Sequence, residues 1–154
     1  MNRTHASTLI ALGLVGAVAT FLLELATAAS GHAVFIPPLT LALTLVIIAV
    51  AVVALAIPIR RAVRGKATGR IDPFRAMRTA ALAKACALAA ALLLGGGVGV
   101  LVYLLSRTAI ASTGPILLTV VSSLAALVLL VAGLVAESFC ILPPDDDDEG
   151  HAHA

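Results

Sequence analysis

Six basic side chains gather near the middle of the chain, where they can bind an anion. They are Arg60, Arg61, Arg64, Arg75, Arg78 and Lys84. Arginine binds phosphate oxygens through paired hydrogen bonds, and Asp72 followed by Pro73 is typical of a helix start, whose free amide groups also attract anions. The anion can be a phospholipid headgroup, a soluble phosphorylated molecule or the acidic tail of this chain. We favour the lipid, because basic residues beside a membrane helix attract anionic lipid by about 1 kcal/mol each.

Glu24 is the second candidate for chemistry, because it is the one acid inside a long apolar run. An ionised carboxylate is costly in a bilayer, so this side chain is expected to hold a proton or to find a partner. A proton- or cation-binding site is one interpretation. The other is a carboxyl that reaches the outer interface or pairs with Arg107 or His32. We favour the second, since Glu24 lies roughly 7 Å from the end of its run and transport sites normally lie near the midplane.

No catalytic motif accompanies these residues. The sequence contains no G-x-S-x-G, P-loop or H-E-x-x-H pattern. Cys86 and Cys140 are too far apart in sequence to form a zinc or redox motif, and the basic stretch has a single aromatic residue, Phe74. We therefore expect no enzymatic activity, no cofactor, no metal centre and no nucleic-acid partner.

The elements that carry these residues are four apolar runs. The chain is 61% hydrophobic with a mean hydropathy of +1.13, against about 45–50% apolar residues in ordinary soluble domains. A run of about 20 residues is long enough to cross a bilayer as a helix. We expect an all-α polytopic membrane protein with four transmembrane helices in one bundle. The expected helices cover about residues 8–29, 39–64, 73–105 and 115–138.

These helices make one transmembrane domain, residues 1–142, followed by an acidic tail, residues 143–154, that is too polar and short to fold. The first run is longer than the apolar segment of a signal peptide, about 7–15 residues, which favours a retained helix. Basic loops stay on the cytoplasmic side of a membrane. Arg3 and the middle loop carry most of the positive charge, while the opposite side has only Arg107. The pattern predicts a cell-membrane protein with both termini in the cytoplasm.

Small residues recur at four-residue spacing on two of the expected helices. In the first run this spacing joins Gly16 to the polar residues Thr20 and Glu24, and the third run carries Ala87, Ala91, Gly95 and Gly99. Small residues let helices approach closely, so we expect these faces to pack within the chain or against a second copy. A substrate path is the alternative, but pathways normally carry polar side chains.

The last apolar run carries two adjacent hydroxyl side chains, Ser122 and Ser123. Both can bind a substrate in principle. Serine hydroxyls inside helices usually bond to carbonyl groups of their own helix or to a neighbouring helix. We expect this second arrangement for both residues.

Several short motifs, in a fixed order, give the chain a family resemblance. They are Pro37-Pro38, Arg60-Arg61, Asp72-Pro73-Phe74-Arg75-Ala76, Leu82-Ala83-Lys84-Ala85, and Cys140 followed by Leu142-Pro143-Pro144 and acids. With these motifs the chain resembles an uncharacterised family of small actinobacterial four-helix membrane proteins, a domain of unknown function. The resemblance covers nearly the whole chain. It implies the same membrane fold and supplies no site residues.

Taken together, the residues predict a non-enzymatic accessory or scaffold subunit whose basic loop contacts anionic lipid. Its expected partners are membrane lipids and either another membrane protein or a second copy. The alternative is a small transporter, or a transporter subunit, for an anionic solute. In that case Glu24 would be the coupling carboxyl.

Overall fold

Four helices make up almost all of the part of the chain that the computed structural model describes, residues 5–31, 36–63, 73–106 and 113–139. They are α1 (Ala6–Ala29), α2 (Leu39–Val63), α3 (Pro73–Ser106) and α4 (Thr113–Phe139). The expected all-α fold is confirmed, and each helix begins and ends within two residues of its expected bounds. The acidic tail lies outside the described residues.

Local chemistry explains where the first two helices end and begin. α1 ends at Ala29 and is capped by Ser30, and the next residue is Gly31, whose φ of 74° lies in the left-handed region that glycine adopts without strain. Its amide donates to the carbonyl of Ala28 at 3.1 Å, and the Ser30 hydroxyl donates to that of Ala26 at 2.9 Å. At the start of α2, the carbonyl of Pro38 accepts a hydrogen bond from the Leu41 amide at 3.0 Å. These bonds satisfy backbone groups that a helix end would otherwise leave without a partner.

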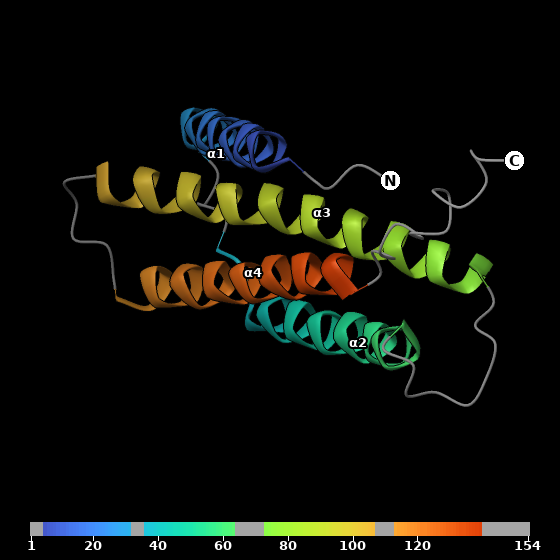
Figure 1. The fold of residues 1–154 in the computed structure, drawn as a ribbon. Coiled ribbons are helices and arrows are strands. Elements are labelled where there is room, and N and C mark those ends of the chain that lie inside the picture. The colour runs from blue at the N-terminus through green and yellow to red at the C-terminus, as the bar shows by residue number, and fades with distance from the viewer. Residues whose placement is uncertain (1–4, 32–35, 64–72, 107–112, 140–154) are drawn as a thin grey trace, which may run out of the picture.

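All four described helices are long and apolar enough to cross a membrane. α3 is the longest, with 34 residues. At 1.5 Å per residue it is roughly 51 Å long, well beyond the roughly 30 Å hydrocarbon core of a bilayer. Its first turns therefore extend past the neighbouring helices, as Figure 1 shows. Met77 and Arg78 lie exposed on this extension.

The helices pack in the spatial order α1, α3, α4, α2, which differs from their order in the chain. α1 packs against α3, α3 against α4, and α4 against α2, which also touches α3 more lightly. Within the described residues, the backbone of α1 does not approach those of α2 or α4. The starts of α1 and α3 lie at the same end of the bundle as the ends of α2 and α4 (Figure 1). Consecutive helices are therefore antiparallel.

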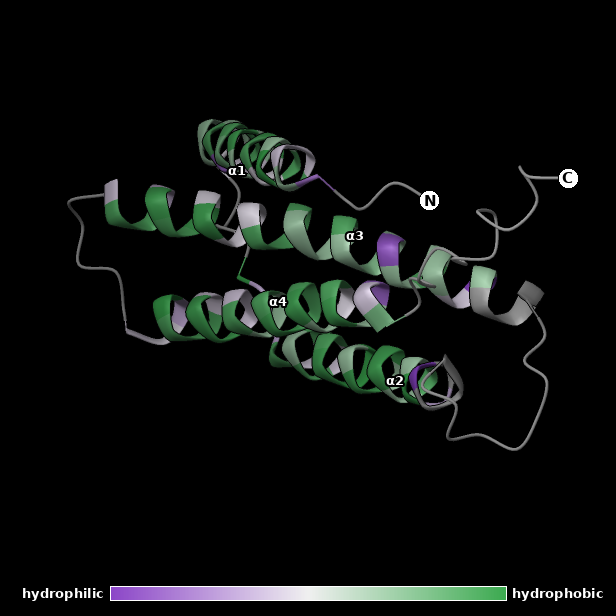
Figure 2. Ribbon diagram, in the orientation of Figure 1, coloured by the Kyte–Doolittle hydropathy of each residue, from purple (hydrophilic) through white to green (hydrophobic). Residues whose placement is uncertain are grey.

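The distribution of side-chain size is the reverse of that in a soluble bundle. Most of the buried apolar residues are alanines, whereas long aliphatic side chains lie exposed on every helix. Figure 2 shows the resulting apolar exterior, with the hydrophilic segments of α2, α3 and α4 lying toward one end. Lipid is as apolar as leucine, so membrane helices gain from close backbone packing rather than from burying large side chains. The pattern is the one expected for helices surrounded by lipid.

Candidate functional site

The contact between α1 and α3 is a contact between two backbones. A Cβ atom on Gly95 would overlap the backbone of Gly13, and one on Gly99 would overlap that of Ala17. From the other side, a Cβ on Gly16 would overlap the carbonyl oxygen of Leu92. Glycine at these positions removes the side chains that would hold the helices apart, which maximises van der Waals contact. Within this chain, three of the residues singled out for helix packing meet at one interface.

The small-residue series of α3 serves two different neighbours. Ala87, near its beginning, packs against α4, where a Cβ on Gly133 would lie 3.0 Å from the Ala87 Cβ. Ala91 lies between the two contacts and is 4% exposed, with its carbonyl oxygen directed at α1 near Gly13. Gly95 then contacts α1. The series changes neighbours because a four-residue step covers about 400°, so the face rotates by roughly 40° per step.

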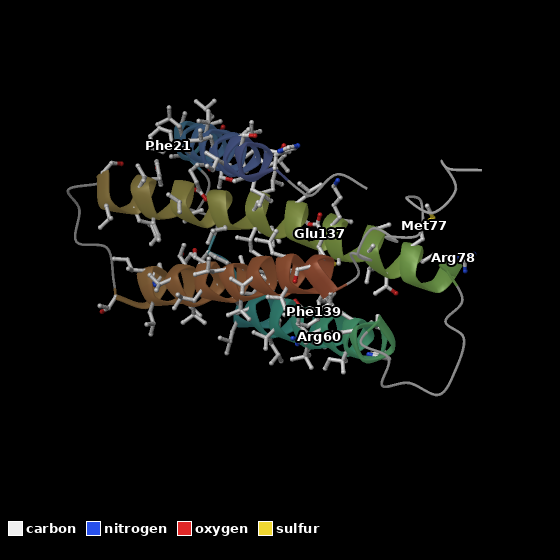
Figure 3. All side chains as sticks on the ribbon, viewed as in Figure 1. Phe21, Arg60, Met77, Arg78, Glu137 and Phe139 are labelled. Atoms are coloured by element: carbon white, nitrogen blue, oxygen red, sulfur yellow. The ribbon has the colours of Figure 1, made fainter. Side chains whose placement is uncertain are left out.

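Glu24 is fully enclosed at the far end of the α1–α3 contact. The residue is 1% exposed, and its backbone carbonyl accepts a hydrogen bond from the Thr27 hydroxyl at 3.0 Å. Phe21, one turn earlier, packs edge-on against Tyr103 of α3 with ring centroids 6.2 Å apart and an interplanar angle of 73°. The label in Figure 3 marks Phe21 on α1. Arg107 and His32, which the sequence suggested as partners of Glu24, lie outside the described residues.

A cavity of about 240 Å³ lies where all four helices contribute residues. α1 supplies Val15, Gly16, Ala19 and Thr20, and α3 supplies Leu92, Leu93, Gly96, Gly97 and Val100; Leu41, Leu45, Ser122, Ser123 and Ala126 come from α2 and α4, and Pro37 precedes α2. None of these fifteen described residues is ionisable. Glu24 does not line the cavity. The polar side-chain groups that line the cavity are three hydroxyls, so the cavity suits an uncharged molecule.

The hydroxyl groups of α4 differ in their hydrogen-bond partners. Thr119 donates to the carbonyl of Pro115 at 2.8 Å, and Ser123 donates to that of Thr119 at 2.8 Å. Ser122 is 6% exposed, and its Oγ has no hydrogen-bond partner among the described residues. The expected bond to the same helix or to a neighbouring one is therefore confirmed for Ser123, whereas Ser122 makes neither bond within the described residues. Gly97 explains part of the difference, because a Cβ there would overlap the Ser123 Oγ and displace it.

The basic residues lie toward one end of the bundle. The guanidinium carbon of Arg60 lies 4.1 Å from the centre of the Phe139 ring, a cation–π contact between the ends of α2 and α4. Figure 3 shows this pair, with Glu137 on the same end of α4 and Arg78 on the extension of α3. Arg78 is exposed, whereas Lys84, one to two turns further along, is half-buried.

The side chains of three more predicted anion-contact residues lie outside the described part of the structure. Arg61 belongs to α2 and Arg75 to α3, but their side chains are outside the description, and Arg64 lies between the described segments. Among the residues that are described, no cluster of three or more His, Cys, Asp or Glu side chains is close enough to hold a metal ion. Anion binding by the whole basic group stays a prediction.

Sequence reasoning did not find the cavity or the Arg60–Phe139 contact. Both depend on which helices are neighbours, and four apolar runs of similar length leave that open. The paired serines were the available signal for the cavity, because they are hydroxyl side chains on an otherwise apolar stretch and both line it. The aromatic residue at the end of α4 was the signal for the second contact.

Four antiparallel helices with an apolar exterior, small residues at their contacts and charge toward one end define a multi-pass membrane protein. A family of proteins of unknown function, DUF3180, matches residues 9–144. The chain therefore belongs to this family. No curated protein and no solved structure matches it.

Proposed function

We propose that the protein is a non-enzymatic accessory or scaffold subunit of the cell membrane that contacts anionic lipid at its basic end. The observation that carries this proposal is the separation of the basic side chains from the cavity. The described lining of the cavity is entirely uncharged, whereas Arg60 and Arg78 lie toward one end of the bundle, and Lys84 follows Arg78 by one to two turns of α3. A pathway for an anionic solute would be expected to place charged or strongly polar groups inside the bundle.

The basic end is proposed to face the cytoplasm, because cytoplasmic loops retain an excess of lysine and arginine. The starts of α1 and α3 and the ends of α2 and α4 share that end. We therefore expect a reporter that works only in the cytoplasm to be active at either terminus, and a reporter that works only outside to be active when inserted between α3 and α4. The reverse pattern would contradict this orientation.

An accessory role predicts a protein partner in stoichiometric amount. The tagged protein would be extracted from its native membrane with the surrounding lipid, and the bound proteins and lipids would be identified by mass spectrometry. We expect one partner at a fixed ratio together with enrichment of anionic lipid. Recovery of the chain alone with lipid would contradict the accessory role. Arg78→Gln should lower the anionic lipid enrichment, because the exposed guanidinium attracts headgroups.

The second candidate function, a small transporter for an anionic solute, rests on Glu24. A carboxyl that is 1% exposed inside a membrane-spanning helix is the kind of residue that couples transport to protons. Glu24→Gln keeps the shape of the side chain and removes its charge. Under the accessory proposal we expect Glu24→Gln to leave recovery of the partner unchanged. Glu137→Gln makes the same substitution at the end of α4 and is the matched control. Loss of proton-coupled anion uptake in vesicles with Glu24→Gln alone would instead support the transporter.

A further inference from the structure

We propose that the cavity between the four helices binds a neutral, chain-like lipid, with the Ser122 hydroxyl hydrogen-bonded to the ligand's single oxygen. The ligand class comprises long-chain or isoprenoid alcohols and ketones. The inference does not depend on the accessory role, since an accessory subunit and a transporter could each hold such a molecule. It rests on the volume of the cavity, the chemistry of its lining and the state of one hydroxyl.

The volume selects a slender occupant. A cavity of roughly 150 Å³ with an apolar lining is large enough for benzene, so about 240 Å³ has room for a longer molecule. A transmembrane helix does not fit. A helix with its side chains is about 10–12 Å across, and 240 Å³ corresponds to roughly two residues of its length. Gly96 and Gly97 line the cavity without a side chain, and a Cβ at these positions would meet Thr20 and Ser123, two other lining residues.

Among the described residues that line the cavity, Ser122 has a buried hydroxyl without a hydrogen-bond partner. Its neighbours Thr119 and Ser123 donate to carbonyls of their own helix. Ser122 is 94% buried and is one of the residues that line the cavity, and its buried Oγ has no partner in the described chain. A buried hydroxyl without a hydrogen bond is costly, and within a bilayer there is little water to satisfy it. A ligand oxygen in the cavity would satisfy it.

The depth of Ser122 identifies the kind of oxygen. The residue lies nine positions after the start of α4 at Thr113, or roughly 14 Å along the helix. The hydrocarbon half of a bilayer is about 15 Å deep, so Ser122 lies well below the phospholipid headgroups. An oxygen that reaches it must be uncharged and carried on a mostly apolar molecule. Because of this requirement and the uncharged lining, we infer that the ligand is a long-chain or isoprenoid alcohol or ketone.

The first test uses hexadecanol with a diazirine on its chain as a photoaffinity probe, in vesicles that contain the whole protein. We expect crosslinks at buried cavity residues such as Leu45, Val100 and Ala126, and competition by unlabelled hexadecanol. Ser122→Ala should raise the probe concentration needed for half-maximal labelling about three- to tenfold, the range expected for one hydrogen bond. Ser123→Ala is the matched control and should change it little, because that hydroxyl is already bonded to Thr119.

A second variant blocks the cavity without adding bulk to the core. Ala19 lines the cavity but is itself exposed, so Ala19→Leu should fill the cavity edge, preserve the helical signal and abolish cavity labelling. Equal labelling of the lipid-facing residues Leu14 and Val18, or the same concentration dependence in Ser122→Ala, would overturn the proposal. Protection of the cavity by a crosslinked partner protein would overturn it in favour of a docking site.

The source of the ligand is determined by mass spectrometry of neutral lipids that co-purify with the protein. We expect one long-chain or isoprenoid species to be retained by wild type and by Ser123→Ala and to be recovered in a smaller amount from Ser122→Ala. Its fragmentation distinguishes a straight chain from an isoprenoid one. If wild type retains no neutral lipid and the probe does not label the cavity, the proposal is wrong. The accessory role can still hold in that case, because its test measures a protein partner.

Discussion

Gly95→Ala is expected to lower the free energy of unfolding by about 1–3 kcal/mol, the usual cost of overpacking a tight contact. The added Cβ would overlap the backbone of Gly13, which cannot rotate away as a flexible side chain could. The two helices must therefore separate, and the loss extends to the neighbouring contact at Gly99. Reversible unfolding in mixed micelles, followed by the helical signal and by the α1–α3 distance between two spin labels, measures the effect.

The control for this prediction is the same substitution on the opposite helix. A Cβ on Gly13 would lie 3.6 Å from the Ala91 carbonyl oxygen, an ordinary van der Waals distance. Gly13→Ala should therefore change stability by less than about 0.5 kcal/mol, as substitutions without a steric or polar penalty normally do. If the two variants lose equal stability, close backbone contact at Gly95 is not what holds α1 to α3.

The sequence predicted the elements and several faces because those depend on local pattern. Long apolar runs fix the helices, and the four-residue series ending at Glu24 predicted a buried face on α1, of which Gly16 and Glu24 are both buried. The partner of each face depends on the spatial order α1, α3, α4, α2, which no local pattern encodes. The division of the α3 series between α4 at Ala87 and α1 at Gly95 follows only once that order is known.

In the candidate site, too, the local sequence pattern identified residues but not their contacts. The sequence pattern marked Ser122 and Ser123 equally. The structure distinguishes them, because the Ser123 hydroxyl donates to the Thr119 carbonyl while the Ser122 Oγ has no partner among the described residues. Arg60 was predicted to bind an anion, and the structure places its guanidinium against Phe139. A cation–π contact contributes about 0.5–1 kcal/mol at an exposed site and does not use the guanidinium N–H groups that point along its plane. Arg60 can therefore hold the ends of α2 and α4 together and still contact a headgroup.

Val50→Asp is expected to reduce membrane insertion of α2 about a hundredfold. Val50 is 64% exposed and lies near the middle of the apolar span Leu39–Pro58. If that exposed surface faces hydrocarbon, a central aspartate costs about 2.5–3.5 kcal/mol, and 1.4 kcal/mol corresponds to a factor of ten. The fraction of protein that resists alkaline extraction from the membrane measures the loss, and protease access to the segment after α2 reports whether that segment has changed sides.

Leu39→Asp provides the matched comparison, because it places the same charge on the same helix at nearly the same exposure. Leu39 is 62% exposed but is the first residue of α2, where the new carboxylate can reach water and headgroups. Insertion should fall far less than for Val50→Asp. In a water-soluble bundle both aspartates would be solvated, and both variants would fold almost normally. A difference that depends on depth therefore requires a bilayer around α2, and equal tolerance of the two substitutions would contradict the membrane assignment.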